Sequence, residues 1–119
     1  MTATSVTLGS YGLHVNDDVD ETEDDVDSGA GVLHEIEIDN TLNAAVTYVK
    51  LWDGTAGSTT PGTTAPDFIF RVAAGVKRTF VIPEGAAYAT ALCVGAVTTP
   101  GTAGTTGPTS AVSVRILFA

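Results

Sequence analysis

Residues 112–118 read Val-Ser-Val-Arg-Ile-Leu-Phe, and residues 32–39 read Val-Leu-His-Glu-Ile-Glu-Ile-Asp. In the first stretch apolar residues recur at every second position, with Arg115 on the opposite face. This period of two is typical of a β-strand with one buried face. In the second stretch the alternation predicts one face with His34 and the isoleucines, and another with Leu33 and three carboxylates.

The same period recurs along the chain, and β-branched residues dominate these stretches. No stretch shows a convincing apolar period of 3.6 residues. Clusters of turn residues, at 39–40, 53–54 and 83–85, separate the predicted strands. Further predicted strands cover residues 45–52, 68–72, 76–82 and 88–97, with an N-terminal strand at 2–8 and a short one at 11–15.

With 119 residues the chain fits one domain. Many short strands between turns predict an all-β fold, an antiparallel two-sheet sandwich, with a jelly-roll or barrel variant left open. Within the single domain, residues 1–30 are expected to form an N-terminal strand or arm and an acidic segment. Residues 31–119 are expected to form the β-sandwich body.

Charge is distributed very unevenly along the chain. The net charge is −9, and eight of the 14 carboxylates lie within residues 17–27. Residues 28–119 hold five basic and six acidic residues, a net charge of −1. An acidic chain without a basic patch is not expected to bind nucleic acid or anionic membranes. No stretch of 18 apolar residues predicts a membrane span, and the first residues do not resemble a signal peptide.

Clustered carboxylates suit hard cations such as calcium, but the acidic run does not match the calcium loop of EF-hands. That loop needs a glycine at its sixth position and a glutamate at its twelfth. Counting from Asp18 these positions hold Glu23 and Gly29, and counting from Asp20 they hold Asp25 and Gly31. The run is therefore predicted to be a solvated loop facing outward, with weak divalent binding as the alternative. No metal or cofactor site is assigned.

Catalytic patterns are missing from the sequence. His14 and His34 are the two imidazoles, and neither accompanies a Gly-x-Ser-x-Gly motif. Glu35 and Glu37 share a strand face, an arrangement typical of a hydrated sheet face. Cys93 lies in an apolar run and is expected to be buried and reduced. We therefore predict that the chain is not an enzyme and assign no catalytic or cofactor-binding residue.

Two long Thr/Gly/Pro segments, residues 53–66 and 98–110, are the candidate contact loops. If successive strands reverse direction, these loops lie at opposite ends of the sandwich. Trp52 precedes the first loop, where its indole either packs between the sheets or is exposed for stacking on a sugar. The predicted interface residues are Thr59, Thr60, Pro61, Gly62, Thr63, Thr64, Thr102, Ala103, Gly104, Thr105 and Thr106, with the N-terminal strand.

Several phrases together resemble a known class of protein. They are residues 35–40 (Glu-Ile-Glu-Ile-Asp-Asn), 43–53 (Asn-Ala-Ala-Val-Thr-Tyr-Val-Lys-Leu-Trp-Asp), 64–67 (Thr-Ala-Pro-Asp), 83–85 (Pro-Glu-Gly) and 112–116 (Val-Ser-Val-Arg-Ile). The chain from about residue 33 to residue 118 resembles small β-sandwich virion proteins of tailed bacteriophages, of the type that decorate or cement capsids.

The resemblance implies a non-enzymatic structural protein on the capsid exterior, made in the bacterial cytoplasm. Its implied partners are the major capsid protein and further copies of itself, as a trimer or dimer. The alternative is a carbohydrate-binding or receptor-binding module of a phage tail or fibre, with Trp52 as the stacking residue. Whether the N-terminal arm exchanges between copies stays open.

Overall fold

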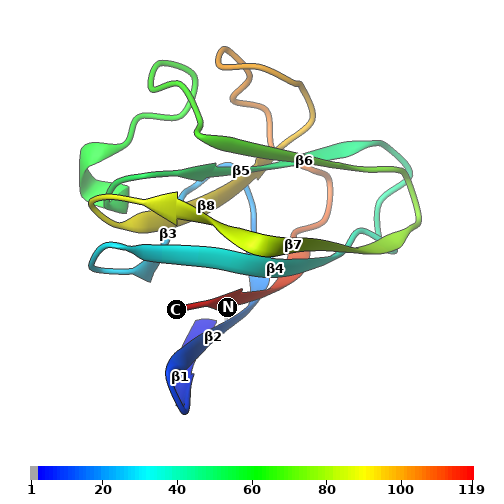
Figure 1. Ribbon diagram of the computed structural model, residues 1–119. Helices are drawn as coiled ribbons and strands as arrows, with labels where there is room; N and C mark the ends of the chain where they lie inside the picture. Colours follow the sequence, from blue (N-terminus) through cyan, green and yellow to red (C-terminus); the bar gives the residue numbers. More distant parts are fainter. Residues whose placement is uncertain (1–2) are drawn as a thin grey trace.

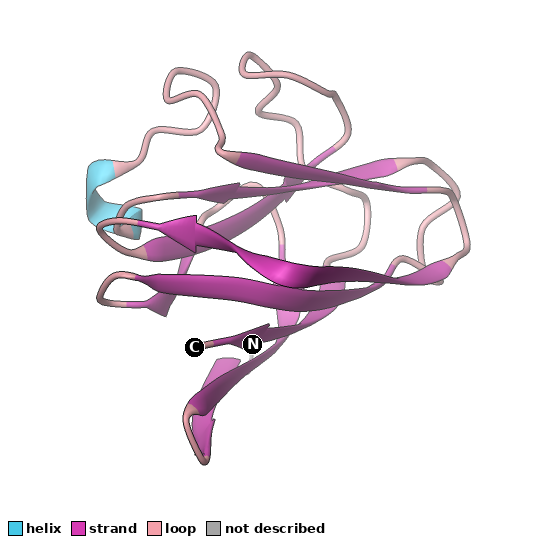
Figure 2. Cartoon of the chain, viewed as in Figure 1, coloured by secondary structure: helices cyan, strands magenta, loops and turns pink. Residues whose placement is uncertain are grey.

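The alternating stretches of the sequence fold into β-strands, as Figure 1 and Figure 2 show for residues 3–119, the part of the chain that this computed structural model describes. Thr2, with which the predicted N-terminal strand begins, lies outside the described residues. The elements are β1 (Ala3–Leu8), β2 (Tyr11–Val19), β3 (Asp24–Asp27), β4 (Gly31–Asp39), β5 (Thr47–Trp52), the 3-10 helix η1 (Ala56–Ser58), β6 (Phe68–Val72), β7 (Lys77–Tyr88), β8 (Leu92–Val97) and β9 (Val112–Phe118).

The strands form two antiparallel sheets. Sheet A has the order β1-β2-β9-β4-β7, and sheet B has the order β3-β8-β5-β6. The chain crosses repeatedly between the sheets, for example from β4 to β5 and from β6 to β7. Neither sheet is therefore formed by one continuous part of the chain. The prediction of an all-β, two-sheet antiparallel sandwich is confirmed. Within the described residues no helix is long and apolar enough to cross a membrane.

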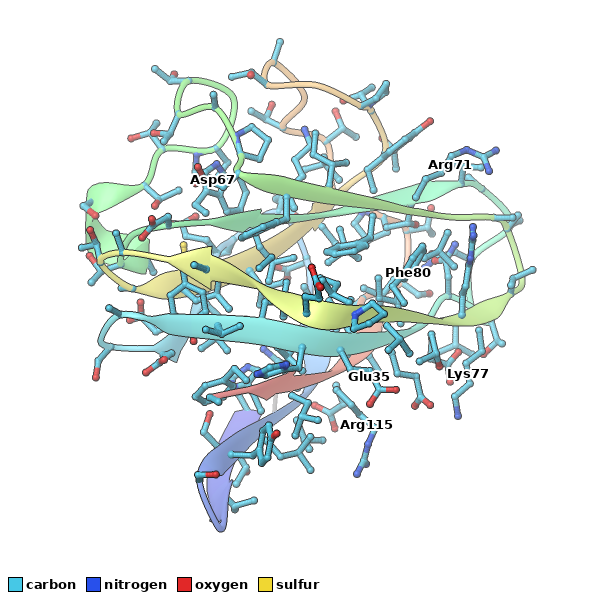
Figure 3. The ribbon with its side chains drawn as sticks, viewed as in Figure 1. Glu35, Asp67, Arg71, Lys77, Phe80 and Arg115 are labelled. Carbon is cyan, nitrogen blue, oxygen red and sulfur yellow. The ribbon has the colours of Figure 1, made fainter. Side chains whose placement is uncertain are left out.

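Inward-facing residues of both sheets form one core, because alternate side chains of each strand point to the same face. Each fully buried aliphatic side chain stabilises the fold by about 1.5–3 kcal/mol. The buried members are Val19, Val26, Leu33, Ile36, Ile38, Val49, Leu51, Val72, Tyr88, Leu92, Val94, Ala96, Val112, Val114 and Ile116. Phe80 packs at the margin of this core, and Figure 3 shows it between the two layers.

A β-bulge in β4 corrects the predicted faces of that strand. Across the β4–β9 pair, Leu33 lies opposite Phe118 and Glu35 lies opposite Leu117, so His34 is an extra residue. Leu33 is fully buried with the isoleucines of the strand, whereas His34 is only partly buried. Placing His34 on the isoleucine face was therefore wrong, because a strict period of two does not survive an inserted residue.

Strand β7 also differs from the prediction. Residues 83–85 were expected to turn, but β7 continues through them to Tyr88 as an irregularity in its pairing with β4. Gly85 has a φ of 75°, and a Cβ at this position would collide with Val32. The chain reverses instead at residues 89–91, so the predicted strand 88–97 is divided between two sheets.

The reversal after β7 is held by one carboxylate. Asp53 accepts hydrogen bonds from the backbone N–H groups of Ala89 and Thr90, both at 2.8 Å. These bonds hold the pKa of Asp53 below its ordinary value, because they favour the ionised carboxylate. A residue at the end of β5 therefore fixes the start of β8, its neighbour in sheet B.

Candidate functional surfaces

The acidic run is not a solvated loop, which corrects the prediction for residues 17–27. Asp17 and Asp18 lie in β2, and Asp24 to Asp27 form the edge strand β3, so that only residues 20–23 connect two strands. Several of these carboxylates accept hydrogen bonds from groups elsewhere in the fold, which stabilises them in their ionised form. Asp25, for example, accepts a hydrogen bond from the backbone N–H of Ala56 at 2.7 Å.

Two of these carboxylates bridge the sheets. Asn16 of sheet A donates its side-chain N–H to Asp24 of sheet B at 2.9 Å. The Tyr88 hydroxyl donates to Asp27 at 2.6 Å. Burial and this carboxylate both raise the pKa of Tyr88, so the hydroxyl remains a donor at any ordinary pH. Among residues 3–119 no three His, Cys, Asp or Glu side chains form a group that could hold a metal ion.

The histidines occupy different environments. His14 is 2% exposed on the inward side of β2, and its Nδ1 lies 2.8 Å from the Ser5 hydroxyl. Its Nε2 has no hydrogen-bond partner in the described residues. Burial lowers the pKa of His14, and the charge of Asp24 offsets part of that effect. His34 contacts the Tyr11 ring edge-on, with ring centroids 5.3 Å apart.

The two long loops meet on one side of the molecule. They leave sheet B at opposite ends, since β5 and β8 are antiparallel, but both bend over its outer face (Figure 1). A Cβ on Gly62 would lie 2.5 Å from the Thr105 methyl group, so the loop tips are in contact. The predicted placement at opposite poles was therefore wrong. We name residues 54–66 and 98–110 the loop cap; neither segment contains a charged residue.

Trp52 lies under the loop cap, on the outer side of sheet B. It is 2% exposed, and its Nε1 donates a hydrogen bond to the Thr64 carbonyl at 2.9 Å. Its ring is neither between the two sheets nor open to a sugar. Cys93 lies opposite Trp52 on β8 and is buried as predicted, with Sγ 3.5 Å from the Thr59 hydroxyl. Burial raises the pKa of the Cys93 thiol, which keeps it protonated.

Lys50 is the unexpected residue of this layer. It shares the covered face with Trp52, is 1% exposed, and its Nζ has no hydrogen-bond partner in the described residues. Opposite it lie Gly95 on β8 and Ile69 on β6, neither of which can pair with an ammonium group. Burial lowers the pKa of Lys50. Strand alternation puts Lys50 beside Trp52, but only the fold of the loops buries it.

The predicted interface residues differ in exposure. Thr59 is 7% exposed and donates its hydroxyl to the Thr55 carbonyl at 2.9 Å, so it supports the cap from below. The exposed members are Thr60, Thr63, Ala103, Thr105 and Thr106, and the half-buried ones are Pro61, Gly62, Thr64, Thr102 and Gly104. The cap therefore presents mainly threonine hydroxyl and methyl groups and backbone.

The outer face of sheet A is open and charged. Glu35, Glu37 and Asp39 point outward from β4, and Figure 3 shows Glu35, Lys77 and Arg115 on this side, away from sheet B. Lys77 Nζ lies 3.5 Å from Glu37 Oε1, an ion pair between β7 and β4. Arg115 lies directly opposite Glu37 on β9 without forming an ion pair.

A shallow hollow of about 230 Å³ crosses this face. Its floor holds apolar and polar groups side by side, and its lining consists of Leu13, Glu35, Glu37, Thr79, Arg115 and Leu117. A second hollow of about 240 Å³ shares Glu37 and Arg115 with the first, so the depression continues toward Lys77. Carboxylates, a guanidinium and leucine side chains together suit an extended polar ligand or a protein surface.

No family model, characterised protein or solved structure matches this chain. The molecule offers two candidate contact surfaces, the uncharged loop cap over sheet B and the charged hollow on sheet A.

Proposed function

We propose that the chain is a non-enzymatic structural protein of a bacteriophage particle, which decorates or cements the capsid exterior as a homo-oligomer. The loop cap is the observation that carries this proposal. It is built from two distant segments without a charged residue, on a protein of net charge −9, and the carboxylates of Glu21 and Asp25 adjoin it at Gly107 and Ala56. The strand-and-turn phrases of residues 33–118, which resemble capsid decoration proteins, supply the biological setting.

An uncharged cap suits permanent contact with another protein. Burying a charge without a partner costs free energy, and the central parts of protein interfaces are depleted in charged residues. Threonine and glycine also lose little side-chain entropy when a partner covers them. In this proposal the cap docks on the major capsid protein.

The cap is ordered before any partner arrives. The backbone N–H of Thr64 donates to the Thr60 carbonyl at 2.8 Å, and that of Thr98 donates to the Thr106 carbonyl at 2.9 Å. The contact between Gly62 and Thr105 then joins the two loops. Association therefore requires little further loop ordering, which favours affinity.

The orientation that follows separates the carboxylates of the protein. With the cap on the capsid, the carboxylates of β4 on sheet A face away from packaged DNA, whose phosphates would repel them, whereas Asp25, which accepts a hydrogen bond from Ala56 of the cap, lies on the capsid side. Because the protein would bind only the assembled shell, binding would stabilise that shell by mass action.

Copy number tests the proposal. Quantitative mass spectrometry of purified particles should give a copy number comparable to that of the major capsid protein. A few copies per particle would contradict decoration and would favour a tail or fibre component. Complete absence from particles would overturn both.

The hollow on sheet A supports a second candidate, a carbohydrate-binding or receptor-binding module of a tail or fibre. Because Trp52 is covered, a sugar would have to bind at this hollow, where Glu37 and Arg115 offer an acceptor and a donor. A glycan array should then give signals that Arg115→Ala removes and Lys77→Ala weakens less. No signal with the unaltered protein would exclude this candidate.

A further inference from the structure

The four edge strands of the sandwich differ in how they are protected. β1 and β7 border sheet A, and β3 and β6 border sheet B. An edge strand exposes unpaired backbone N–H and C=O groups that can pair with a strand of another chain. Natural proteins block such edges with charged side chains, proline, bulges or very short strands.

Three of these edges carry such protection. β3 has four residues, three of them aspartates, and its register with β8 is interrupted. β6 has five residues and includes exposed Arg71. β7 includes Lys77, Arg78 and Pro83, and its pairing with β4 is irregular.

The β1 edge has none of these features. Its six residues, Ala3–Leu8, include no charged residue and no proline, and they pair with β2 without a break in register. Val6 is 47% exposed, a large fraction for a valine in a strand. Figure 1 shows the β1–β2 hairpin extending from the body on the side opposite the loop cap. A hollow of about 310 Å³, lined in part by Val6, Tyr11 and Phe118 and by the turn residues Gly9 and Ser10, lies along the hairpin.

We propose that β1 pairs antiparallel with β1 of a second copy, so that two sheets A join into one continuous sheet across a two-fold axis. Because residues directly opposite in an antiparallel pair point to the same face, the two-fold axis places a residue of β1 opposite itself, either Ser5 opposite Ser5 or Val6 opposite Val6 of the other copy. Each copy keeps β1 paired with its own β2, so the hairpin is shared along its edge and is not exchanged.

Charge selects β1 as the edge through which a second copy of this chain can pair. Two chains of net charge −9 repel each other, and a two-fold contact brings each edge against itself. Such a contact through β3 would oppose aspartates to aspartates, and one through β7 would be hindered by Pro83 and by the irregular pairing of that strand. Like charges directly opposite destabilise strand pairing. At β1 the pairing opposes only uncharged side chains.

This inference deepens the homo-oligomer part of the proposed function, and it leaves the loop cap free because the hairpin extends from the other side (Figure 1). It does not depend on what the cap binds. Pairing is measured on the purified protein alone, and decoration is measured on particles, so either can fail without the other.

Sedimentation equilibrium of the full chain tests the pairing. We expect a dimer at about 0.1 mM, a concentration that populates complexes of micromolar affinity. Val6→Lys should raise the dimer dissociation constant by about tenfold or more, since it places a cation in the uncharged edge. Val81→Lys is the matched control, because Val81 is 63% exposed on the other edge of the same sheet and should leave the constant unchanged.

Thr4→Lys provides a second test in β1, in case Val6→Lys alters the monomer. Hydrogen exchange of β1 amides should slow with increasing protein concentration in the unaltered chain and not in Val6→Lys. A monomer at all concentrations, a trimer, or equal dimerisation of the unaltered, Val6→Lys and Thr4→Lys chains would each overturn the proposal.

Discussion

The outer faces of the two sheets are both set by strand alternation, but one is covered and the other is open to solvent. On sheet B, Lys50, Trp52 and Cys93 are at most 2% exposed, because the loop cap covers them. On sheet A, Val81 is 63% exposed, and the carboxylates of β4 border an open hollow. Alternation decides which side a residue points to, whereas loop length and path decide whether that side meets water.

The largest expected effect concerns Trp52. Trp52→Ala should lower the free energy of unfolding by about 3–5 kcal/mol, because it leaves a cavity under the cap and removes the Nε1 hydrogen bond. Val81→Ala on the open face should change it by less than about 0.5 kcal/mol. Urea unfolding followed by circular dichroism measures both. Equal small effects would mean that the cap does not pack on sheet B.

Lys50 should show a gain of stability. Lys50→Met keeps the apolar stem and removes a buried ammonium without a partner, so we expect an increase of about 1–3 kcal/mol in the free energy of unfolding. Lys77→Met on the open face serves as the control and should not stabilise. A loss of stability in Lys50→Met would show that the ammonium has a partner.

Acid should destabilise the fold through His14. Burial holds the pKa of His14 below its ordinary value of 6.5, so the unfolded chain takes up the proton first. The contribution of neutral His14 to the free energy of unfolding is therefore present above about pH 6.5. It is lost as the pH falls toward the lowered pKa of His14 in the folded protein. His14→Gln should flatten the stability profile between about pH 5 and pH 8, as measured by urea unfolding at several pH values. An unchanged profile in His14→Gln would contradict this assignment.

The smallest effect is expected at the ion pair of the open face. Lys77→Ala removes the contact with Glu37 and should change the free energy of unfolding by less than about 1 kcal/mol, an amount that added salt should reduce further. Thermal unfolding at low and high salt measures it. A larger loss, insensitive to salt, would mean that this face is less hydrated than the structure indicates.

Sequence periodicity was sufficient for the sandwich, because period-two patterns such as residues 112–118 depend only on local backbone geometry. Periodicity failed at positions where contacts between distant parts of the chain determine the local structure. The bulge at His34 shifts one strand by a residue, and the hydrogen bonds of Asp24 and Asp27 turn an apparent solvated run into strands that bridge the sheets. The burial of Trp52 and Lys50 depends on where the cap residues fold, which no local pattern specifies.

The central claim is that the uncharged loop cap is the contact surface of the protein. The test measures how tightly two variants of the protein bind to particles that lack it. Thr105→Lys alters the cap and Thr79→Lys alters the open face, and both positions are exposed threonines. We predict that Thr105→Lys weakens binding by about tenfold or more and that Thr79→Lys binds like the unaltered chain. Full binding by Thr105→Lys with loss in Thr79→Lys would contradict the account and would assign the contact to sheet A.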